Sequence, residues 1–279
     1  MNDSYAHGAI RAVVLDWAGT VVDHGSRAPM QAFVDAFAQF GVSITIADAR
    51  GPMGMAKRDH IRMVGQAPAV AAAWRATHGR EFGEADIDAI FAVFEPLNIA
   101  SVVQHADLIP GASQALAWCT AQEIRIGSTT GYTRPIMDRL APLAAAQGFA
   151  PEVTVCAGDM AAGRPAPLQM WHAMSAMSVW PAHRVVKLDD TPPGIGEARA
   201  AGCWAVGVAL TGNICGLSAG ELAALPEASR APIRSRAARE LSDAGAHLVI
   251  DSIADLPQAL AAIATRVAAG ERPGIDDPT

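Results

Sequence analysis

Asp16 is the residue whose surroundings in the sequence most directly indicate chemistry. It follows the apolar run 12–15 and precedes a turn that contains Gly19. A short buried strand that ends at a carboxylate, followed by a turn rich in backbone N–H groups, presents that carboxylate as a nucleophile beside amides suited to an anion. The alternative is a strand that merely ends at an aspartate before a turn, and this stretch alone does not decide between them.

Further polar groups stand at the expected carboxyl ends of other strands. Thr130 and Gly131 follow the second strand, Arg164 follows the third, and Asp190 follows the fourth. In open parallel sheets these ends meet at one edge, where ligands bind, so the groups are expected to lie together with Asp16. A helix cap would account for Thr130 alone and a surface cation for Arg164 alone, but neither accounts for the set with both carboxylates.

These groups together predict a phosphoryl-transfer site. Asp16 and Asp190 supply the oxygen ligands that Mg2+ takes from proteins, and the metal would screen Asp16 so that it can attack an anionic substrate. Thr130, the Gly131 amide and Arg164 would hold the phosphoryl oxygens, because the guanidinium presents a fork of donors.

A second candidate group lies in residues 52–61, Pro-Met-Gly-Met-Ala-Lys-Arg-Asp-His-Ile. If this segment is helical, Met53, Lys57 and His60 share one face. An amine between a thioether and an imidazole is desolvated, which lowers its pKa enough for the free base to attack a carbonyl group. The alternative is a solvated amphipathic helix with an ordinary lysine and histidine.

Strand and helix patterns alternate over most of the chain. This alternation predicts an α/β fold with a doubly wound parallel (Rossmann-like) sheet covered by helices on both faces. Two polar, alanine-rich helical stretches between residues 211 and 245 are expected to decorate this core, and the residues from Gly270 onward to form a frayed tail. Strands are expected at 12–15, 124–128, 153–156, 184–188, 204–208 and 246–250, and core helices at 112–121, 134–147, 167–177, 194–201 and 256–267.

The alternation is interrupted once, directly after the first strand. No strand pattern occurs in that segment, where helical patterns cover 30–37, a stretch opened by Gly51 and Pro52, 67–78 and 86–94, with Pro96 as a stop. This predicts an inserted all-helical cap domain over residues 24–104 and an α/β core domain made of residues 1–23 and 105–279.

Composition excludes several classes of partner. The chain has 279 residues, of which 51% are hydrophobic, and a net charge of −7 with no run of Lys or Arg, which argues against nucleic acid or an anionic membrane as a partner.

The N-terminal residues show no basic segment followed by an apolar one, and the apolar stretches are too short to span a bilayer, so a cytoplasmic protein is expected. The four scattered cysteines are expected to be buried free thiols rather than a disulfide framework or a zinc site.

The four strand-end groups, in this order, resemble the four motifs of the haloacid dehalogenase-like superfamily. Phosphatases and mutases of that superfamily carry a second aspartate two residues after the first, as the general acid for an oxygen leaving group, whereas this chain has Ala18 there. Ala18 therefore argues against the alternative function, a Mg2+-dependent phosphomonoesterase or phosphomutase. An inert phosphoanion-binding module is a further alternative, which the intact Asp16 and Lys57 oppose.

A more specific resemblance extends from about residue 10 to residue 260. The segments that carry it are 16–20, 50–60, 127–133, 162–165 and 244–252, and together they resemble the phosphonoacetaldehyde hydrolase family. The resemblance implies hydrolysis of the carbon–phosphorus bond of phosphonoacetaldehyde to acetaldehyde and phosphate, in the degradation of 2-aminoethylphosphonate. It also implies a homodimer formed through cap helices such as residues 30–40.

Carried onto this chain, the resemblance gives each site residue a role. Lys57 would form a Schiff base with the aldehyde and Asp16 would accept the phosphoryl group, with His60 as proton carrier. Because the departing carbon becomes an enamine, no acid is needed at Ala18. Mg2+ would be held by Asp16, Asp190 and the Ala18 carbonyl, and the substrate by Ala18, Gly19, Met53, Thr130, Gly131, Tyr132 and Arg164.

Two positions depart from the family pattern. Many relatives carry an aspartate where this chain has Gly194, which leaves Asp189 as a possible helper in metal binding. Ser26 stands where some members carry cysteine, so a thiol role is not expected there.

Overall fold

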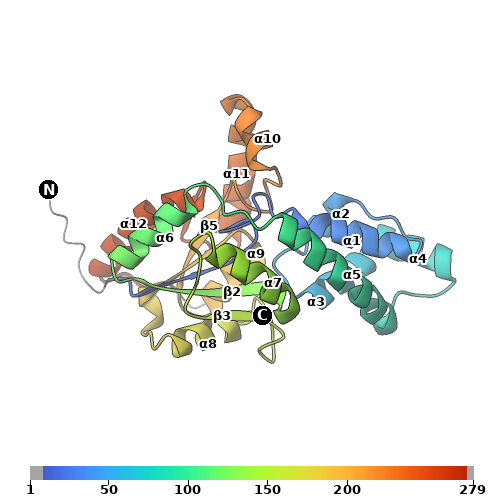
Figure 1. Cartoon of the computed structure of the whole chain (residues 1–279), viewed down its shortest axis with the longest axis horizontal. Coiled ribbons are helices and arrows are strands. Elements are labelled where there is room, and N and C mark those ends of the chain that lie inside the picture. The colour runs from blue at the N-terminus through green and yellow to red at the C-terminus, as the bar shows by residue number, and fades with distance from the viewer. Residues whose placement is uncertain (1–8, 275–279) are drawn as a thin grey trace.

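The computed structural model describes residues 9–274 and is built around a parallel sheet of six strands in the order β3-β2-β1-β4-β5-β6 (Figure 1). β1 lies at the centre and pairs with β2 on one side and β4 on the other. All carboxyl ends therefore meet at one edge of the sheet. The strands are β1 Ala12–Leu15, β2 Arg125–Thr133, β3 Thr154–Ala157, β4 Val185–Asp189, β5 Trp204–Val208 and β6 Leu248–Ile250.

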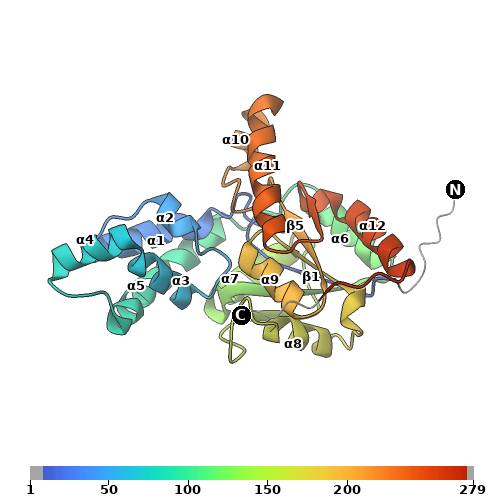
Figure 2. The same ribbon diagram turned by 180° about the vertical axis from the view of Figure 1, so that it is seen from behind.

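Helices cover both faces of this sheet because alternate side chains of β1 point to opposite sides. Val13 and Leu15 join one hydrophobic cluster with residues of α6, α7 and α12, whereas Ala12 and Val14 join another with residues of α8. α9 and α11 pack against β5 on that second side (Figure 2). The core helices are α6 Ala112–Ala121, α7 Arg134–Ala145, α8 Leu168–Ala176, α9 Pro192–Ala200, α11 Glu227–Asp243 and α12 Leu256–Ala268, with 3-10 turns at Ala182–Arg184 and Ile253–Asp255.

The segment between β1 and α6 contains helices joined by loops and no strand, and its helices have their own hydrophobic cluster. Phe33, Phe37, Trp74, Ile90 and Phe94 are among the buried residues of that cluster. These helices form a cap that extends from the strand-end edge of the sheet (Figure 1). They are α1 Ala28–Gln39, α2 Ile46–Arg50, α3 Lys57–Gln66, α4 Pro68–His78 and α5 Glu84–Gln104.

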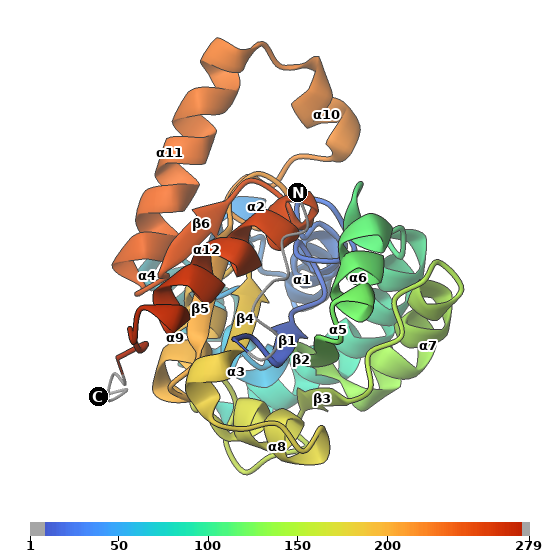
Figure 3. The ribbon, with the colours of Figure 1, turned by 90° about the vertical axis from the view of Figure 1, so that its left-hand side faces the viewer.

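α10, Ala219–Ala224, and the first turns of α11 project from the core as a helical hairpin (Figure 3). The polar helical stretches expected between residues 211 and 245 are these two helices. Of the expected tail from Gly270, residues 270–274 follow α12 without helix or strand, and residues 275–279 lie outside the described part of the chain. Among the helices of residues 9–274, none combines the length and apolar character needed to cross a membrane.

The predicted fold class, a doubly wound α/β core with an inserted all-helical cap, is confirmed, but three element boundaries differ by more than two residues. The helix expected from Gly51 and Pro52 begins only at Lys57, because Gly54 adopts a left-handed backbone conformation with φ of 92° that breaks the helical path. Pro96 does not stop α5, which continues for eight further residues to Gln104 and packs against α1 and α7. β2 continues to Thr133, past the expected end at Ser128.

Candidate active site

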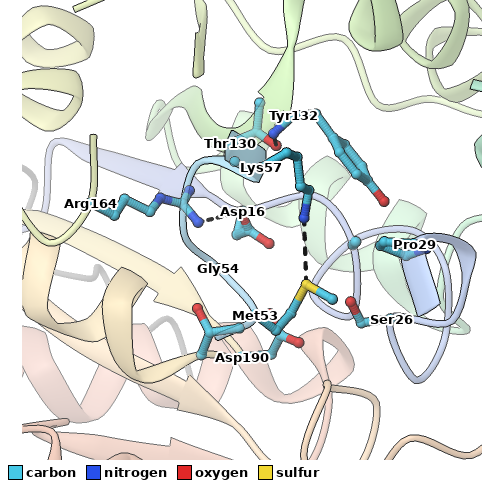
Figure 4. Close-up of a pocket in the computed structure, with 13 residues that line it drawn as sticks. Asp16, Ser26, Pro29, Met53, Gly54, Lys57, Thr130, Tyr132, Arg164 and Asp190 are labelled. Atoms are coloured by element: carbon cyan, nitrogen blue, oxygen red, sulfur yellow. Dashed lines mark hydrogen bonds and ion pairs between the residues drawn. The ribbon is translucent and has the colours of Figure 1, made fainter. Parts of the chain in front are cut away.

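A pocket lies where the strand ends meet the loop before α3 (Figure 4). The core contributes the carboxyl ends of β1, β2 and β4 and the loop after β3. The cap side contributes the linker into the cap, the start of α1, the first residue of α3 and the loop before it. Nine of the residues predicted from the sequence line this pocket. The lining residues are Asp16, Ala18, Ser26, Pro29, Met53, Gly54, Lys57, Thr130, Gly131, Tyr132, Arg164, Asp190 and Thr191.

Three buried carboxylates converge on the core side of the pocket. Each of Asp16, Asp189 and Asp190 offers an oxygen within 4.8 Å of the others. Asp190 is anchored by the Asn213 backbone N–H, which donates to Oδ2 at 2.6 Å, while Thr20 Oγ1 lies 3.4 Å from Oδ1. Such a set of hard oxygen donors fits Mg2+, which is bound through one or two carboxylates together with substrate oxygens.

The pKa values of Asp16 and Asp190 are raised, so their charged forms are disfavoured in this pocket. Burial is the largest cause that raises the pKa of Asp16 to about 6, and the charge of Asp189 adds to it, whereas Arg164 opposes the rise. Burial, followed by the charges of Asp16 and Asp189, raises the pKa of Asp190 well above its usual range. A divalent cation between them would reverse the repulsion, so the electrostatics also fit a metal.

Arg164 is held rigidly on the wall of the pocket. Its Nη1 lies 2.8 Å from Asp16 Oδ1, and its Nη2 donates to the carbonyl and the hydroxyl of Thr129 at 2.7 and 2.9 Å. Its Nε lies 3.0 Å from Glu197 Oε2. A guanidinium fixed in this way keeps its Nη1 beside Asp16, which suits recognition of a phosphoryl group delivered to that carboxylate.

Sequence reasoning missed the buried ion pairs behind Arg164. Lys187 Nζ lies 3.3 Å from Asp189 Oδ2 and 3.2 Å from Glu197 Oε2, and none of these side chains is exposed. The signal was present, because Lys187 is the one charged residue inside the run Val-Val-Lys-Leu before Asp189. A lysine in a buried strand needs a partner, which a search of the adjacent helix could have found in Glu197.

Lys57 is the first residue of α3 and points into the pocket (Figure 4). Its Nζ lies 3.6 Å from Met53 Sδ, 5.3 Å from the centre of the Tyr132 ring and 5.8 Å from that of Phe33. Burial among these groups lowers the pKa of Lys57 to about 8, although the charge of Asp16 opposes the change. A useful fraction of the amine is therefore the free base near neutral pH.

The structure places His60 differently from the sequence prediction. Met53 belongs to the loop before α3, so it contacts Lys57 without sharing a helical face with it. His60 does not line the pocket; its ring stacks on Phe33 at 4.0 Å and its Nε2 donates to the Ala49 carbonyl at 2.6 Å. Burial lowers the pKa of His60 well below its usual range, so it is neutral in this position.

The predicted phosphate-binding residues fall into two groups. Thr130, Gly131 and Tyr132 lie on the pocket wall, where the Thr130 hydroxyl accepts a hydrogen bond from the Tyr132 N–H at 3.0 Å. The Gly19 N–H is instead directed to the carbonyl oxygens of Val22 and Asp23, at 2.8 and 3.1 Å. Gly19 serves a steric purpose, because a Cβ there would lie 2.2 Å from Asp190 Oδ2.

Gly194 leaves space that Asp189 fills. A Cβ at position 194 would lie 2.0 Å from Asp189 Cγ, so the two positions cannot both carry a carboxylate in this arrangement. Asp189 Oδ1 accepts hydrogen bonds from the N–H and hydroxyl of Thr191, at 3.0 and 2.7 Å. With Lys187 and Arg164 beside its other oxygen, Asp189 is already compensated, and Asp16 and Asp190 are the carboxylates left for a metal.

Comparison with known proteins agrees with this geometry. Residues 10–202 match the family model described as haloacid dehalogenase-like hydrolase. The chain belongs to the haloacid dehalogenase-like hydrolases. A crystal structure described as a phosphonoacetaldehyde hydrolase-like protein from Oleispira antarctica aligns with a TM-score of 0.94 and 38% identity, over 98% of this chain and 99% of that one. A hydrolase from Pseudomonas syringae shares the fold alone, with a TM-score of 0.65 and 17% identity over 90% of this chain and 97% of that one.

Curated relatives indicate to which family within the haloacid dehalogenase-like hydrolases this chain belongs. The phosphonoacetaldehyde hydrolase of Paraburkholderia phytofirmans is 50% identical over 264 residues, which cover 95% of this chain and 99% of that protein. The protein of the same name from Klebsiella pneumoniae is 47% identical over 266 residues, again 95% of this chain and 99% of the relative. Within the haloacid dehalogenase-like hydrolases, this chain therefore belongs to the family of these relatives.

Proposed function

We propose that this protein hydrolyses the carbon–phosphorus bond of phosphonoacetaldehyde, releasing acetaldehyde and phosphate. The observation that carries the proposal is the pairing of a buried lysine of lowered pKa with an aspartate nucleophile in one pocket, while Ala18 stands where an acid for an oxygen leaving group would be. The names of the full-length relatives support the same substrate.

The first step activates the carbon side of the substrate. The free amine of Lys57 adds to the aldehyde carbon, and loss of water gives a protonated imine. Met53 and Tyr132 flank the amine and keep water from it. The positive iminium next to the methylene group can accept the electrons of the carbon–phosphorus bond, which an aldehyde in water does far less well.

The second step transfers the phosphoryl group. An Asp16 oxygen attacks phosphorus, the bond to carbon breaks, and its electrons form an enamine on Lys57. Arg164 and the Thr130–Gly131 segment hold the phosphoryl oxygens during this step. Protonation of the enamine and hydrolysis of the imine release acetaldehyde, and water hydrolyses the aspartyl phosphate, so one water is consumed overall.

We further propose that Mg2+ is the metal, held by Asp16, Asp190 and the Ala18 carbonyl. When bound, it would neutralise charge at the phosphoryl oxygens and the nucleophile. The support is the convergence of buried carboxylates described above.

Borohydride trapping tests the imine. Adding borohydride with phosphonoacetaldehyde should inactivate the enzyme and leave a reduced two-carbon adduct on Lys57, located by mass spectrometry of peptides. Phosphate release should depend on the aldehyde, so p-nitrophenyl phosphate should be a poor substrate. Turnover of that ester at a comparable rate, with no adduct on Lys57, would favour a phosphomonoesterase and sink the proposal.

The division into a core of residues 1–23 and 105–279 and a cap of residues 24–104 is proposed because buried residues from Met30 to Phe94 form a hydrophobic cluster of their own. Ala28 and Val102, close to the two linkers, pack with the core cluster instead. Association of two copies through the cap is also proposed, and light scattering of the purified protein would test it. Met30, Phe33 and Phe37 of α1 are buried within the cap of the same chain, so the contact would have to use other faces.

A further inference from the structure

Arg50, the last residue of α2, joins the cap to the core through backbone oxygens. Its Nη1 donates to the carbonyls of Asn213 and Gly25 at 2.8 and 3.1 Å and to Asn213 Oδ1 at 3.1 Å, and its Nη2 lies 3.4 Å from the Gly216 carbonyl. Asn213 Nδ2 returns a bond to the Arg50 carbonyl at 3.3 Å. Arg50 thus links three segments: the cap helix, the linker into the cap, and the core loop after β5.

The core loop is shaped around this guanidinium. Gly216 has φ of 71°, and a Cβ there would lie 2.7 Å from Arg50 Cζ. Gly25 has φ of 87° and donates its N–H to the Thr211 carbonyl at 2.7 Å, which ties the linker to the same loop. Since the acceptors around Arg50 are mostly carbonyl oxygens in fixed directions, a planar fork of donors satisfies them and a lysine ammonium does not.

Asn213 carries the connection to the metal site. Its side chain accepts a hydrogen bond from Arg50 Nη1 and donates one to the Arg50 carbonyl. Its backbone N–H donates to Asp190 Oδ2 at 2.6 Å. The same loop is fixed to the turn after Asp16, because the Thr211 hydroxyl donates to the Gly19 carbonyl at 3.0 Å. A displacement of Arg50 would therefore move the group that orients a metal-binding carboxylate.

On the other side, Arg50 is followed at once by the loop that carries the cap residues of the pocket. Met53 lies three positions later and Lys57 seven. The loop is seated on the core at Gly54, where a Cβ would lie 2.2 Å from Thr191 Oγ1. Holding Arg50 against the core therefore fixes the start of the segment that delivers the amine.

We propose that Arg50 is a positioning residue that couples closure of the cap loop to the geometry of the metal-binding carboxylate Asp190, through Asn213. Closing the cap and binding the metal then favour one another, because a coupling free energy between two sites is reciprocal. The proposal deepens the proposed function, but its principal test is metal binding, which does not require that function to be right.

The experiment compares Arg50→Lys with Arg75→Lys, a matched change at an exposed arginine of α4. The dissociation constant for Mg2+ is measured by calorimetry without substrate, and kcat and KM are measured with phosphonoacetaldehyde. Arg50→Lys is expected to weaken Mg2+ binding roughly tenfold, within the usual range of coupling between sites. It should also lower kcat and slow borohydride trapping at Lys57, whereas Arg75→Lys should match the wild type.

Asn213→Ala keeps the backbone N–H but removes the side-chain hydrogen bonds to Arg50, so it should weaken Mg2+ binding in the same way. The double variant should be no weaker than the worse single variant, because both break one connection. A folded Arg50→Lys protein that binds Mg2+ within twofold of the wild type overturns the coupling, even if it is less thermostable. If the wild type binds Mg2+ but releases no phosphate from phosphonoacetaldehyde, the proposed function fails while the coupling is still decided by the binding data.

Discussion

Lys57 sets the pH dependence that we expect of imine formation. The nucleophile is the free amine, and burial lowers the pKa of Lys57 to about 8. Below that pH the amine is protonated and the rate of borohydride inactivation should fall about tenfold per pH unit; above it the rate should level off. Lys57→Arg keeps the charge but cannot form an imine, so it should be inactive and give no adduct at any pH.

The pH profile is measured at saturating Mg2+ with a fixed aldehyde concentration. A rate that keeps rising to pH 10 would mean that Lys57 has the pKa of an exposed lysine and that burial does not activate its amine. Substantial turnover by Lys57→Arg would contradict the imine mechanism itself.

Ala18 is the second residue at which the two candidate chemistries diverge. A carboxylate there would stand beside Asp16, whose pKa burial and neighbouring charge already raise. We expect Ala18→Asp to lower kcat on the phosphonate at least tenfold, because added like charge favours the protonated, non-nucleophilic form of Asp16. Ala18→Asn introduces a side chain of the size of aspartate without its charge, so it is the control and should lose less kcat than Ala18→Asp. An Ala18→Asp rate equal to the wild type would show that an acid at this position does no harm.

The sequence predicted most residues of the pocket because chemistry-bearing side chains at strand ends must meet at one edge. Asp16, Thr130, Arg164 and Asp190 could be placed in this way without knowing any helix packing. His60 could not, because its position depends on where α3 begins and on the aromatic packing within the cap. Glu197 could be inferred only by asking which residue of the adjacent helix pairs with the buried Lys187.

At the scale of elements, the loop before α3 decides where the amine lies. Gly54 has φ of 92°, and a Cβ there would lie 2.2 Å from Thr191 Oγ1. We expect Gly54→Ala to lift this loop from the core and to slow both phosphate release and trapping at Lys57 at least tenfold. Because an alanine is strained at this positive φ, the variant should also lose about 1 kcal/mol of stability and still fold.

Gly51→Ala is the matched control in the same loop. A Cβ at position 51 meets nothing within 4 Å, and its backbone is right-handed with φ of −52°, so this variant should behave like the wild type. Equal rates for the two variants would mean that the seating of the loop on Thr191 does not position Lys57.

Element types were easier to predict than element ends. The apolar periodicity of α1, α6 and α12 identified each of them, since a helix that packs on a core must repeat its apolar residues. Pro96 was misread as a stop because the rule is local: proline removes one backbone hydrogen bond. The packing of α5 against both α1 and α7 offsets that loss, and no local pattern reveals it.

At the scale of the molecule, the alternation of strands and helices determined the sheet, and its single interruption determined the cap. The sequence did not reveal how the two are joined. Arg50 and Asn213 are 163 positions apart in the chain, and Gly54 and Thr191 are also far apart in sequence. Contacts of this kind depend on how the cap docks on the core.

The balance of charge in the pocket predicts that a bound metal ion would stabilise the whole protein. Asp16, Asp189 and Asp190 each offer an oxygen within 4.8 Å of the others. Burial and the charge of Asp189 raise the pKa of Asp16, and burial and the charges of Asp16 and Asp189 raise the pKa of Asp190. A folded-state pKa above the ordinary value means that ionised Asp16 and Asp190 lower the stability at neutral pH, and a bound cation would offset that loss.

We therefore expect Mg2+ at a hundred times its dissociation constant to stabilise the protein by about 2.7 kcal/mol, which raises the midpoint of thermal unfolding by roughly 5 °C at this chain length. EDTA should remove the shift together with turnover, and added Mg2+ should restore both. Asp190→Asn should unfold no earlier than the metal-free wild type, because it removes a repulsive charge, yet should respond to Mg2+ far less. Asp138→Asn, at an exposed position of α7, should retain the full shift. Full turnover in EDTA, or an undiminished shift in Asp190→Asn, would show that these carboxylates do not hold the metal on which the reaction depends.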